Sequence, residues 1–383
     1  MGGRGESMNA GQPRAFADTA GYIRAADGSE RNLAEKAGYF RMAAERFTET
    51  GSPLYAALAR GCADDADLLA LAAHAPNGQL PFYLLFGAVQ FLLFQRPDQP
   101  LAGFYSLRPA LIEFEQAFGA FRAFCLEHSR EIVAIMRSRT VQMTTVSRAA
   151  LLVPSMALVA DEAGEPLSLI EVGCSAGLLS LFDHYRYDFG AAGCVGNPQG
   201  IAISGAGFRG LSRVSKVLPR IGRRWGIDLC PIDPNDVAER RWIESLIPPD
   251  WSDERRQLAA ALDYRARTPL ETITGDALAE VPKLLADIPG PVCIFHAHCL
   301  YQWPPDKRDV FDEMLRNLSQ VRTLHRLSME YTDPRWAALI EPRQPDPRLP
   351  FELIYSVFRD GRQHARRLAC YDGYGRDVVW LGG

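Results

Sequence analysis

One loop constrains the fold of this chain more than any other feature. Leu167–Val172 is a short apolar run, and small residues follow it at once: Gly173, Ser175, Ala176 and Gly177. An apolar run that ends in a glycine-rich turn is typical of a strand that leads into a helix in a parallel α/β sheet. We therefore expect a strand over Leu167–Val172 and a helix that opens at Gly177 and runs to about Tyr187.

The rest of the C-terminal half repeats this alternation. Further apolar runs of strand length occur at 226–229, 270–274, 292–296, 323–329 and 351–357. Helical patterns lie between most of them, as at 242–246, 252–265 and 306–320. Alternating strands and helices predict a mostly parallel sheet. Residues 351–358 and 366–380 carry strands with no helix between them, so we expect a Rossmann-like α/β sheet over 151–383 that ends in antiparallel strands.

The N-terminal part has helical patterns only. From residue 39 to 149, apolar residues recur at three- and four-residue spacing, with one longer helix expected over 111–137. The most apolar stretch, 80–94, is too short to span a bilayer and predicts a buried helix. Residues 1–35 are rich in Gly, Ala and Ser and predict a flexible tail. The expected organisation is a tail (1–35), a helical region (36–150) and the sheet domain (151–383).

Composition narrows the class of protein. The formal net charge is −4, which argues against a general nucleic-acid binder. The eight cysteines form no Cys-x-x-Cys pair, as expected for reduced thiols in the cytoplasm. The opening MGGRGESMNAGQPRAF lacks the apolar run of a signal peptide. We expect a cytoplasmic protein that binds a small molecule and binds neither nucleic acid nor a membrane. The sequence leaves open whether the protein forms a homodimer.

The glycine-rich loop favours S-adenosylmethionine as cofactor. Glu171 at the strand end can hydrogen-bond the amino group of a methionine moiety, a contact that a dinucleotide site does not need. Backbone N–H groups at Gly173, Ser175 and Gly177 would face polar groups of the ligand. The alternative is a tight turn that binds nothing.

Acidic residues after the next two strands extend this pocket. Asp228 follows the second strand, where an acid would bind the ribose hydroxyls, and Asp233 is its rival. Asp228 lies far beyond the usual ~20 residues from Gly177, so an insertion must separate them. Asp276 and Ala277 follow the third strand, where an acid can accept from the adenine amino group. Asp276 is equally suited to cap the next helix.

Through these residues the chain resembles a bacterial family of methyltransferase-like proteins described mainly as a domain of unknown function. The resemblance covers most of the chain, including 52–55, 84–89, 142–148, 171–190, 226–229 with Trp242, and 275–276. It implies a class I methyltransferase fold with an S-adenosylmethionine pocket and names no substrate. The family pattern has His where this chain has Gln90, and Thr-Asn-Glu where it has Met143, Thr144 and Thr145. If those positions shape the acceptor pocket, this member uses a different acceptor or none.

Two histidines are the candidate catalytic residues. His296 and His298 end the fourth strand, and imidazole can take a proton from a hydroxyl or carboxyl acceptor near neutral pH. Alternation places both on one face if the strand extends through them. They can instead be ordinary polar residues at a strand end. Metal binding with Cys299 is the competing use, but no second spaced pair is visible, so we expect no metal.

Two other clusters leave alternatives open. Residues 189–227 contain no acid but six cations, which could clamp a carboxylate or phosphate or simply form a solvated loop: Arg209, Arg213, Lys216, Arg220, Arg223 and Arg224. An aromatic stripe could line an apolar acceptor pocket or belong to the core: Phe82, Tyr83, Phe86, Phe91 and Phe94.

The leading hypothesis is an S-adenosylmethionine-dependent methyltransferase that acts on a small molecule. We expect the methylated atom to be an oxygen and not a nitrogen. No Asp/Asn-Pro-Pro-Tyr pattern supports methylation of amides or base amines. The helical region would then cover the site as a lid. The alternative is a catalytically silent methyltransferase fold that senses a ligand or binds a partner. A nicotinamide-dependent oxidoreductase is disfavoured, because the acid expected about 20 residues after the glycines is missing.

Overall fold

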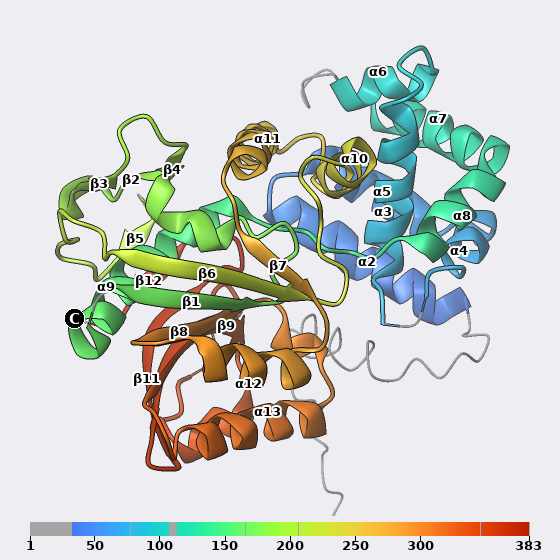
Figure 1. Ribbon diagram of the computed structural model, residues 1–383. Coiled ribbons are helices and arrows are strands. Elements are labelled where there is room, and N and C mark those ends of the chain that lie inside the picture. The colour runs from blue at the N-terminus through green and yellow to red at the C-terminus, as the bar shows by residue number, and fades with distance from the viewer. Residues whose placement is uncertain are drawn as a thin grey trace, which may run out of the picture.

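The computed structural model describes residues 33–76, 78–106, 113–164, 166–205, 207–344 and 346–382. A group of helices from the N-terminal third lies against a large twisted sheet (Figure 1). The tail expected over 1–35 lies outside the described residues up to position 32. Residues 33–35 already belong to the first described helix.

The helical prediction for the N-terminal region is confirmed. Its helices are α2 (Leu33–Glu49), α3 (Pro53–Ala63), α4 (Ala66–Ala72), α5 (Pro81–Leu93), α6 (Pro100–Ser106), α7 (Phe114–Glu127) and α8 (Ser129–Ser138). The prediction of a single helix over 111–137 is wrong. The helix is interrupted at His128, whose φ of −103° and ψ of 21° are not helical and separate α7 from α8. Within the described residues, every helix is too short or too polar to cross a membrane.

The sheet has nine strands in the order β5-β12-β11-β10-β9-β8-β1-β6-β7. Five of them run parallel to one another: β7 (Glu271–Thr274), β6 (Ile221–Asp228), β1 (Leu167–Val172), β8 (Val292–Ala297) and β9 (Leu324–Tyr331). The others continue it on one side: β10 (Phe351–Arg359), β11 (Arg362–Tyr371), β12 (Val378–Trp380) and β5 (Phe208–Arg209). Because β10 and β11 pair antiparallel, the predicted mixed α/β sheet with antiparallel C-terminal strands is confirmed.

Helices cover both faces of the sheet (Figure 1). One face carries α12 (Ala277–Asp287) and α13 (Pro305–Leu318). The other face carries α9 (Ala149–Ala163), α10 (Val237–Ser245), α11 (Ser252–Arg267) and the N-terminal helices. Alternate side chains of β1 enter the two cores, Leu169 on the α9 side and Ile170 on the α12 side. The larger core is continuous from Phe40 to Trp380, so the helical region and the sheet share buried apolar contacts.

The segment after the glycine-rich loop differs from the prediction. No α-helix opens at Gly177; a 3₁₀ helix (Leu179–His184) is followed by β2 (Arg186–Asp188), β3 (Cys194–Gly196) and β4 (Ala202–Ser204), which form a small separate sheet. The N–H groups of Leu181 and Tyr185 donate to carbonyls three residues earlier, as in a 3₁₀ helix, and the hydroxyls of Tyr185 and Tyr187 donate to the same carbonyls of Leu178 and Phe182. This insert accounts for the long spacing between Gly177 and Asp228.

Candidate functional site

A cavity of about 310 Å³ lies at the carboxyl ends of β1, β6, β7 and β8. The strand order reverses here, because β6 pairs with one side of β1 and β8 with the other. Such a switch point is where open α/β sheets bind ligands. Most predicted site residues line the cavity: Glu171, Gly173, Ser175, Asp228, Asp276, Ala277 and His298. Gly177 and His296 are not among its lining residues.

Positive φ angles bring the loop backbone close to the cavity. Gly173, Ser175 and Gly177 have φ values of 74°, 50° and 71°. A Cβ on Gly173 would lie 2.3 Å from the sulfur of Cys299, so only glycine fits between β1 and the loop after β8. A Cβ on Gly177 would instead meet Leu270 at 2.1 Å. Gly177 is therefore a packing position, whereas Gly173 and Ser175 form the wall.

Glu171 is a buried carboxyl group, and only one of its two oxygens accepts hydrogen bonds from the described residues. Its Oε2 accepts from the Ser180 hydroxyl at 2.6 Å and from the Ser180 N–H at 3.1 Å. No described residue donates to its Oε1. Burial raises the pKa of Glu171 to about 8, although the Ser180 hydrogen bonds oppose that rise. The predicted contact with a ligand amino group stays a prediction, and Oε1 is the atom that can make it.

The two predicted acids hold the loops that surround the cavity. Asp228 accepts from the Ser175 N–H at 2.8 Å and from the Cys230 N–H at 2.9 Å. Its rival Asp233 accepts from Asn235 in a turn and lies outside the cavity lining. The Asp228 carboxylate therefore ties the glycine-rich loop to the end of β6 while facing the cavity.

Asp276 caps α12, the alternative that the sequence left open. It accepts from the Leu278 N–H at 3.0 Å and from the Lys307 ammonium at 2.7 Å. Partial burial disfavours its ionised form, but Lys307 and the Leu278 N–H outweigh burial and lower its pKa. Asp276 and Ala277 still line the cavity, so capping and a ligand contact are compatible.

The two histidines lie on different sides of the sheet, contrary to the expectation that depended on a longer strand. Strand β8 ends at Ala297, and His298 leaves it with a φ of 56°. His298 lines the cavity, stacks on Phe351 at 4.1 Å and lies 3.2 Å from the Tyr371 hydroxyl. Burial, with the nearby Arg148 cation, lowers the pKa of His298 well below its ordinary value, so the ring is neutral at pH 7.

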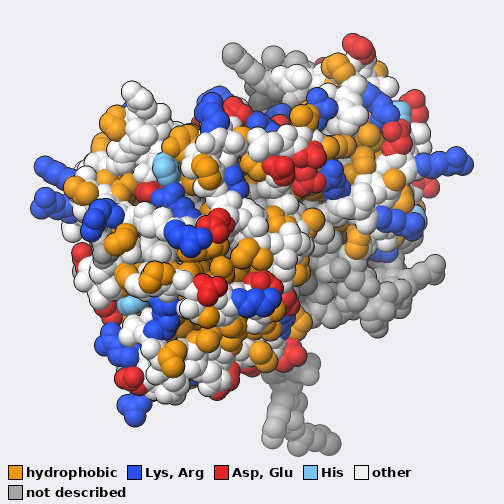
Figure 2. All heavy atoms as spheres, in the orientation of Figure 1, with side chains coloured by type: hydrophobic (Ala, Val, Ile, Leu, Met, Phe, Trp, Pro, Cys, Tyr) orange, Lys and Arg blue, Asp and Glu red, His pale blue; other side chains and the backbone are white. Residues whose placement is uncertain are grey.

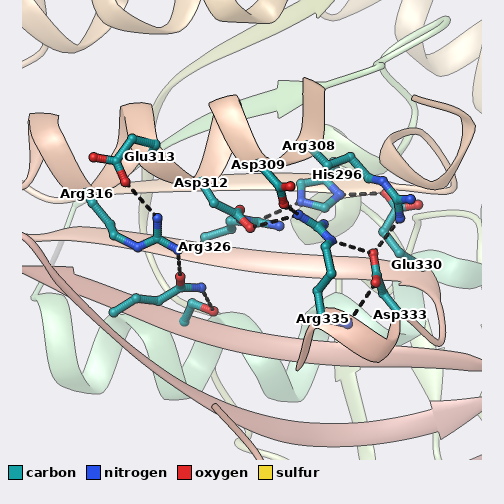
Figure 3. Close-up of polar contacts among 12 residues, drawn as sticks. His296, Arg308, Asp309, Asp312, Glu313, Arg316, Arg326, Glu330, Asp333 and Arg335 are labelled. Atoms are coloured by element: carbon teal, nitrogen blue, oxygen red, sulfur yellow. Dashed lines mark hydrogen bonds and ion pairs between the residues drawn. The ribbon is translucent and has the colours of Figure 1, made fainter. Parts of the chain in front are cut away.

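His296 belongs to a buried polar network under the other face (Figure 3). Its Nδ1 lies 2.6 Å from Glu330, and its Nε2 accepts from the Arg326 guanidinium at 3.0 Å. This arrangement places the proton on Nδ1 and leaves no ring nitrogen for an acceptor. Burial lowers the pKa of His296, which keeps it neutral even beside Glu330. His296 therefore has a structural position, and the histidine that faces the cavity is His298.

Sequence reasoning missed Glu330, which positions the loop after β8. Its carboxylate accepts from the N–H groups of Cys299, Leu300 and Tyr301 at 3.0–3.1 Å, besides its contact with His296. Further ion pairs join the network to α13, as Figure 3 shows: Arg326 with Asp312, Arg308 with Asp333, and Arg335 with Asp309, Asp312 and Asp333. The one sequence sign was a charged residue at the end of a predicted strand, and Arg326 within that strand is charged as well.

A second cavity of about 230 Å³ adjoins the first. The two share three wall residues: Met143, Arg148 and His298. The second cavity is mostly apolar and is lined by rings from both parts of the chain: Phe47, Phe82, Tyr83, Tyr301, Phe351 and Tyr374. Of the predicted aromatic stripe, Phe82 and Tyr83 thus face a cavity, whereas Phe86 is fully buried in the core.

The two departures from the family pattern have different places. Gln90 donates to the carbonyls of Ile247 and Glu244 at 2.9 and 3.3 Å, so it ties α5 to α10 and lies away from both cavities. Met143 faces both cavities, Thr144 the first and Thr145 the second. Only the departure at 143–145 therefore bears on a bound molecule.

The basic insert lies apart from the cavities. Figure 2 shows Lys and Arg side chains at the left edge of the molecule, where Figure 1 places the segment of β2–β4. Arg209, Arg223 and Arg224 pair with acids at 2.6 Å, and none of the six cations lines either cavity. These positions favour the interpretation of the segment as a solvated basic loop over its use to bind a carboxylate or phosphate of a ligand. In the described part of the chain, no three His, Cys, Asp or Glu side chains are grouped to hold a metal ion.

Comparison with known proteins identifies the family of this chain but assigns no activity to it. No curated protein and no solved structure matches the chain. The family DUF2332, described as an uncharacterized protein conserved in bacteria, matches residues 37–380 and so includes both the helical region and the sheet with its cavities. The chain belongs to the DUF2332 family.

Proposed function

We propose that the protein is an S-adenosylmethionine-dependent methyltransferase that acts on an oxygen atom of a small molecule. The observation that carries this proposal is the first cavity, at the reversal point of five parallel strands and against a glycine-rich loop. Doubly wound sheets that bind nucleotides have this order and this place for the ligand. The antiparallel strands β10 and β11 favour a methyltransferase-type sheet over a dinucleotide-binding one.

The residues around the cavity fit the cofactor. Glu171 would hold the amino group, Asp228 the ribose hydroxyls, and Asp276 with Ala277 the adenine. The absence of a side chain at Gly173 lets Cys299 pack against the glycine-rich loop beside the cavity. When bound, the cofactor supplies a methyl group on a positively charged sulfur.

His298 is the residue that would handle the acceptor's proton. It stands in the wall between the two cavities, and its neutral ring can accept a proton from a hydroxyl group. The stack on Phe351 and the Tyr371 hydroxyl fix the ring plane. Removing His298 is expected to slow methylation of a hydroxyl acceptor more than it weakens cofactor binding.

Calorimetry with S-adenosylmethionine and with its demethylated product tests the proposal directly. Binding of both in the micromolar range is expected, followed by release of the demethylated product in the presence of an acceptor. If millimolar cofactor gives neither heat nor thermal stabilisation, the proposal is wrong.

A catalytically silent ligand-binding protein is the second candidate. One observation favours it: the carboxylates of Asp228 and Asp276 already accept hydrogen bonds from the protein at both oxygens. Each oxygen has a second lone pair, so a ligand can still bind there. Binding of the cofactor without turnover on any hydroxyl or carboxyl acceptor would favour this candidate.

Cofactor affinity is expected to depend on pH through Glu171. In the free protein its pKa is about 8, so the carboxyl group is protonated at pH 6. An ammonium group bound beside it favours the ionised form, so binding releases a proton from Glu171. Affinity should therefore rise with pH, by up to about tenfold per unit between about pH 5 and 7.5, until the ligand amine itself titrates near 8.

The measurement is calorimetry at three pH values, in two buffers of different ionisation enthalpy to count the released proton. The matched control is Glu171→Gln, which keeps an oxygen acceptor but cannot titrate. A flat profile is expected for this variant. An equally steep profile in Glu171→Gln would show that another group is responsible.

A further inference from the structure

Arg148 is a buried cation with no anionic partner among the described residues. Its exposed fraction is 4%, and within that part of the chain its one hydrogen bond is a long one of 3.4 Å from Nη2 to the Met143 carbonyl. The Nε atom is buried and has no acceptor, and no carboxylate of the described residues forms an ion pair with the guanidinium. An unpaired buried charge destabilises a protein unless something binds it.

Other buried arginines of this chain are satisfied differently. Arg326 and Arg308 are as deeply buried as Arg148, and each pairs with an aspartate of the protein. Glu330 contributes to the field at Arg148, but its oxygens are held by His296 and by three backbone N–H groups. Arg148 is thus a guanidinium that faces two cavities instead of a carboxylate.

The second cavity defines the rest of the ligand. Most of its lining is apolar or aromatic, including Phe82, Tyr301, Phe351 and Tyr374. Glu45 and the ion pair of Arg46 with Glu49 line it as well. A surface of this kind binds an apolar or aromatic body, whereas a guanidinium binds a carboxylate through two parallel hydrogen bonds. The cavity and its cation together fit a molecule with an apolar body and one anionic end.

We propose that the second cavity binds a small carboxylic acid with an aromatic or aliphatic body, and that Arg148 pairs with its carboxylate. The role of this acid as methyl acceptor rests on the proposed function, and its ionised carboxylate would have no proton for His298 to remove; its binding does not rest on that function. Arg148 lies in the wall that the two cavities share, so the carboxylate end of the acid would lie next to the cofactor cavity.

The test uses 3-phenylpropanoate and octanoate as probes, with 3-phenylpropanamide as the neutral control, on the full chain with and without the demethylated cofactor. Arg148→Met is expected to weaken binding of both acids about 10- to 100-fold and to leave amide binding unchanged. Arg148→Lys keeps the charge without the planar fork and should lose about threefold to tenfold. The demethylated cofactor should bind all these variants within about threefold of the native protein.

Thermal unfolding separates a ligand-binding arginine from a structural one. The ligand-free Arg148→Met protein should be as stable as the native protein or more so, because an unpaired buried charge is removed. Arg224→Met is the matched control: Arg224 pairs with Asp183 at 2.6 Å and lies outside both cavities. This variant should lose stability and keep acid binding.

Each contrary outcome has a distinct meaning. If the acids bind no better than the amide, or do not bind, the inference about Arg148 is wrong even when the demethylated cofactor binds. If Arg148→Met loses the cofactor and not the acids, Arg148 is a cofactor contact and the inference is also wrong. If the acids bind through Arg148 but the cofactor does not bind, the inference stands and the proposed function fails.

Discussion

Gly173→Ala is expected to abolish binding of S-adenosylmethionine. The new Cβ would lie 2.3 Å from the Cys299 sulfur and 2.6 Å from its Cβ, and the loop after β8 is held in place by Glu330. Either the glycine-rich loop or Cys299 must therefore shift, and both line the cavity. The residue must also keep a φ of 74°, which costs about 1–2 kcal/mol for a residue with a side chain. We expect at least about a 100-fold loss of affinity, since a displacement of this size removes several contacts at once.

Gly290→Ala is the control that isolates the clash. Gly290 has a φ of 75°, and a Cβ there would meet nothing within 4 Å. The two variants should therefore share the backbone penalty, and only Gly173→Ala should lose the cofactor. Calorimetry and thermal unfolding of both proteins make the comparison. Affinity within threefold of the native value in Gly173→Ala would mean that the cofactor does not lie against this loop.

Glu330→Ala is expected to lower the free energy of unfolding by about 3–5 kcal/mol, because buried donors that lose a charged acceptor cost about 1–3 kcal/mol each. The carboxylate is 6% exposed and faces His296 and three backbone N–H groups. Its removal leaves those donors buried without an acceptor. The loop that carries His298 should then loosen, so cofactor binding should weaken as well.

Urea unfolding measures this loss, and Glu313→Ala is its control. Glu313 pairs only with Arg316 one turn away on the surface of α13, a contact worth well under about 1 kcal/mol. Glu330→Gln keeps an oxygen acceptor and should fall between the two. A loss below about 1 kcal/mol in Glu330→Ala would show that the network does not hold the loop.

The strands of the large sheet were predictable because they are buried on both faces. Residues 292–296 are almost wholly apolar; residues 324–329 mix apolar and polar side chains, but all of them are buried, so no exposed face interrupts either strand. The small sheet of the insert was missed because β2, β3 and β4 have three residues each, too few to show any periodicity. The α-helix expected after Gly177 is a short 3₁₀ helix instead, whose carbonyls at Leu178 and Phe182 each accept a backbone N–H and a tyrosine hydroxyl.

The candidate site was predictable only where it follows the strand ends. Glu171, Asp228 and Asp276 sit at fixed positions after strands, so sequence spacing was enough to place them at one edge. Glu330 matters because of the backbone N–H groups that it holds in the folded protein, and Arg148 because no described carboxylate pairs with it. Neither relation can be read from sequence spacing. A charged residue within a buried strand is the one sign that could have identified Glu330, and Arg148 gave none beyond its polarity.

The pairing of β5 with β12 joins segments that are made at very different times. Residues 208–209 leave the ribosome long before residues 378–380, and no other strand can complete that edge in the native order. A nascent chain therefore carries an open sheet edge during much of its synthesis, and open edges recruit strands from other molecules. Yield in a bacterial host should thus depend on translation speed and on chaperone supply more than the stability of the finished protein would suggest.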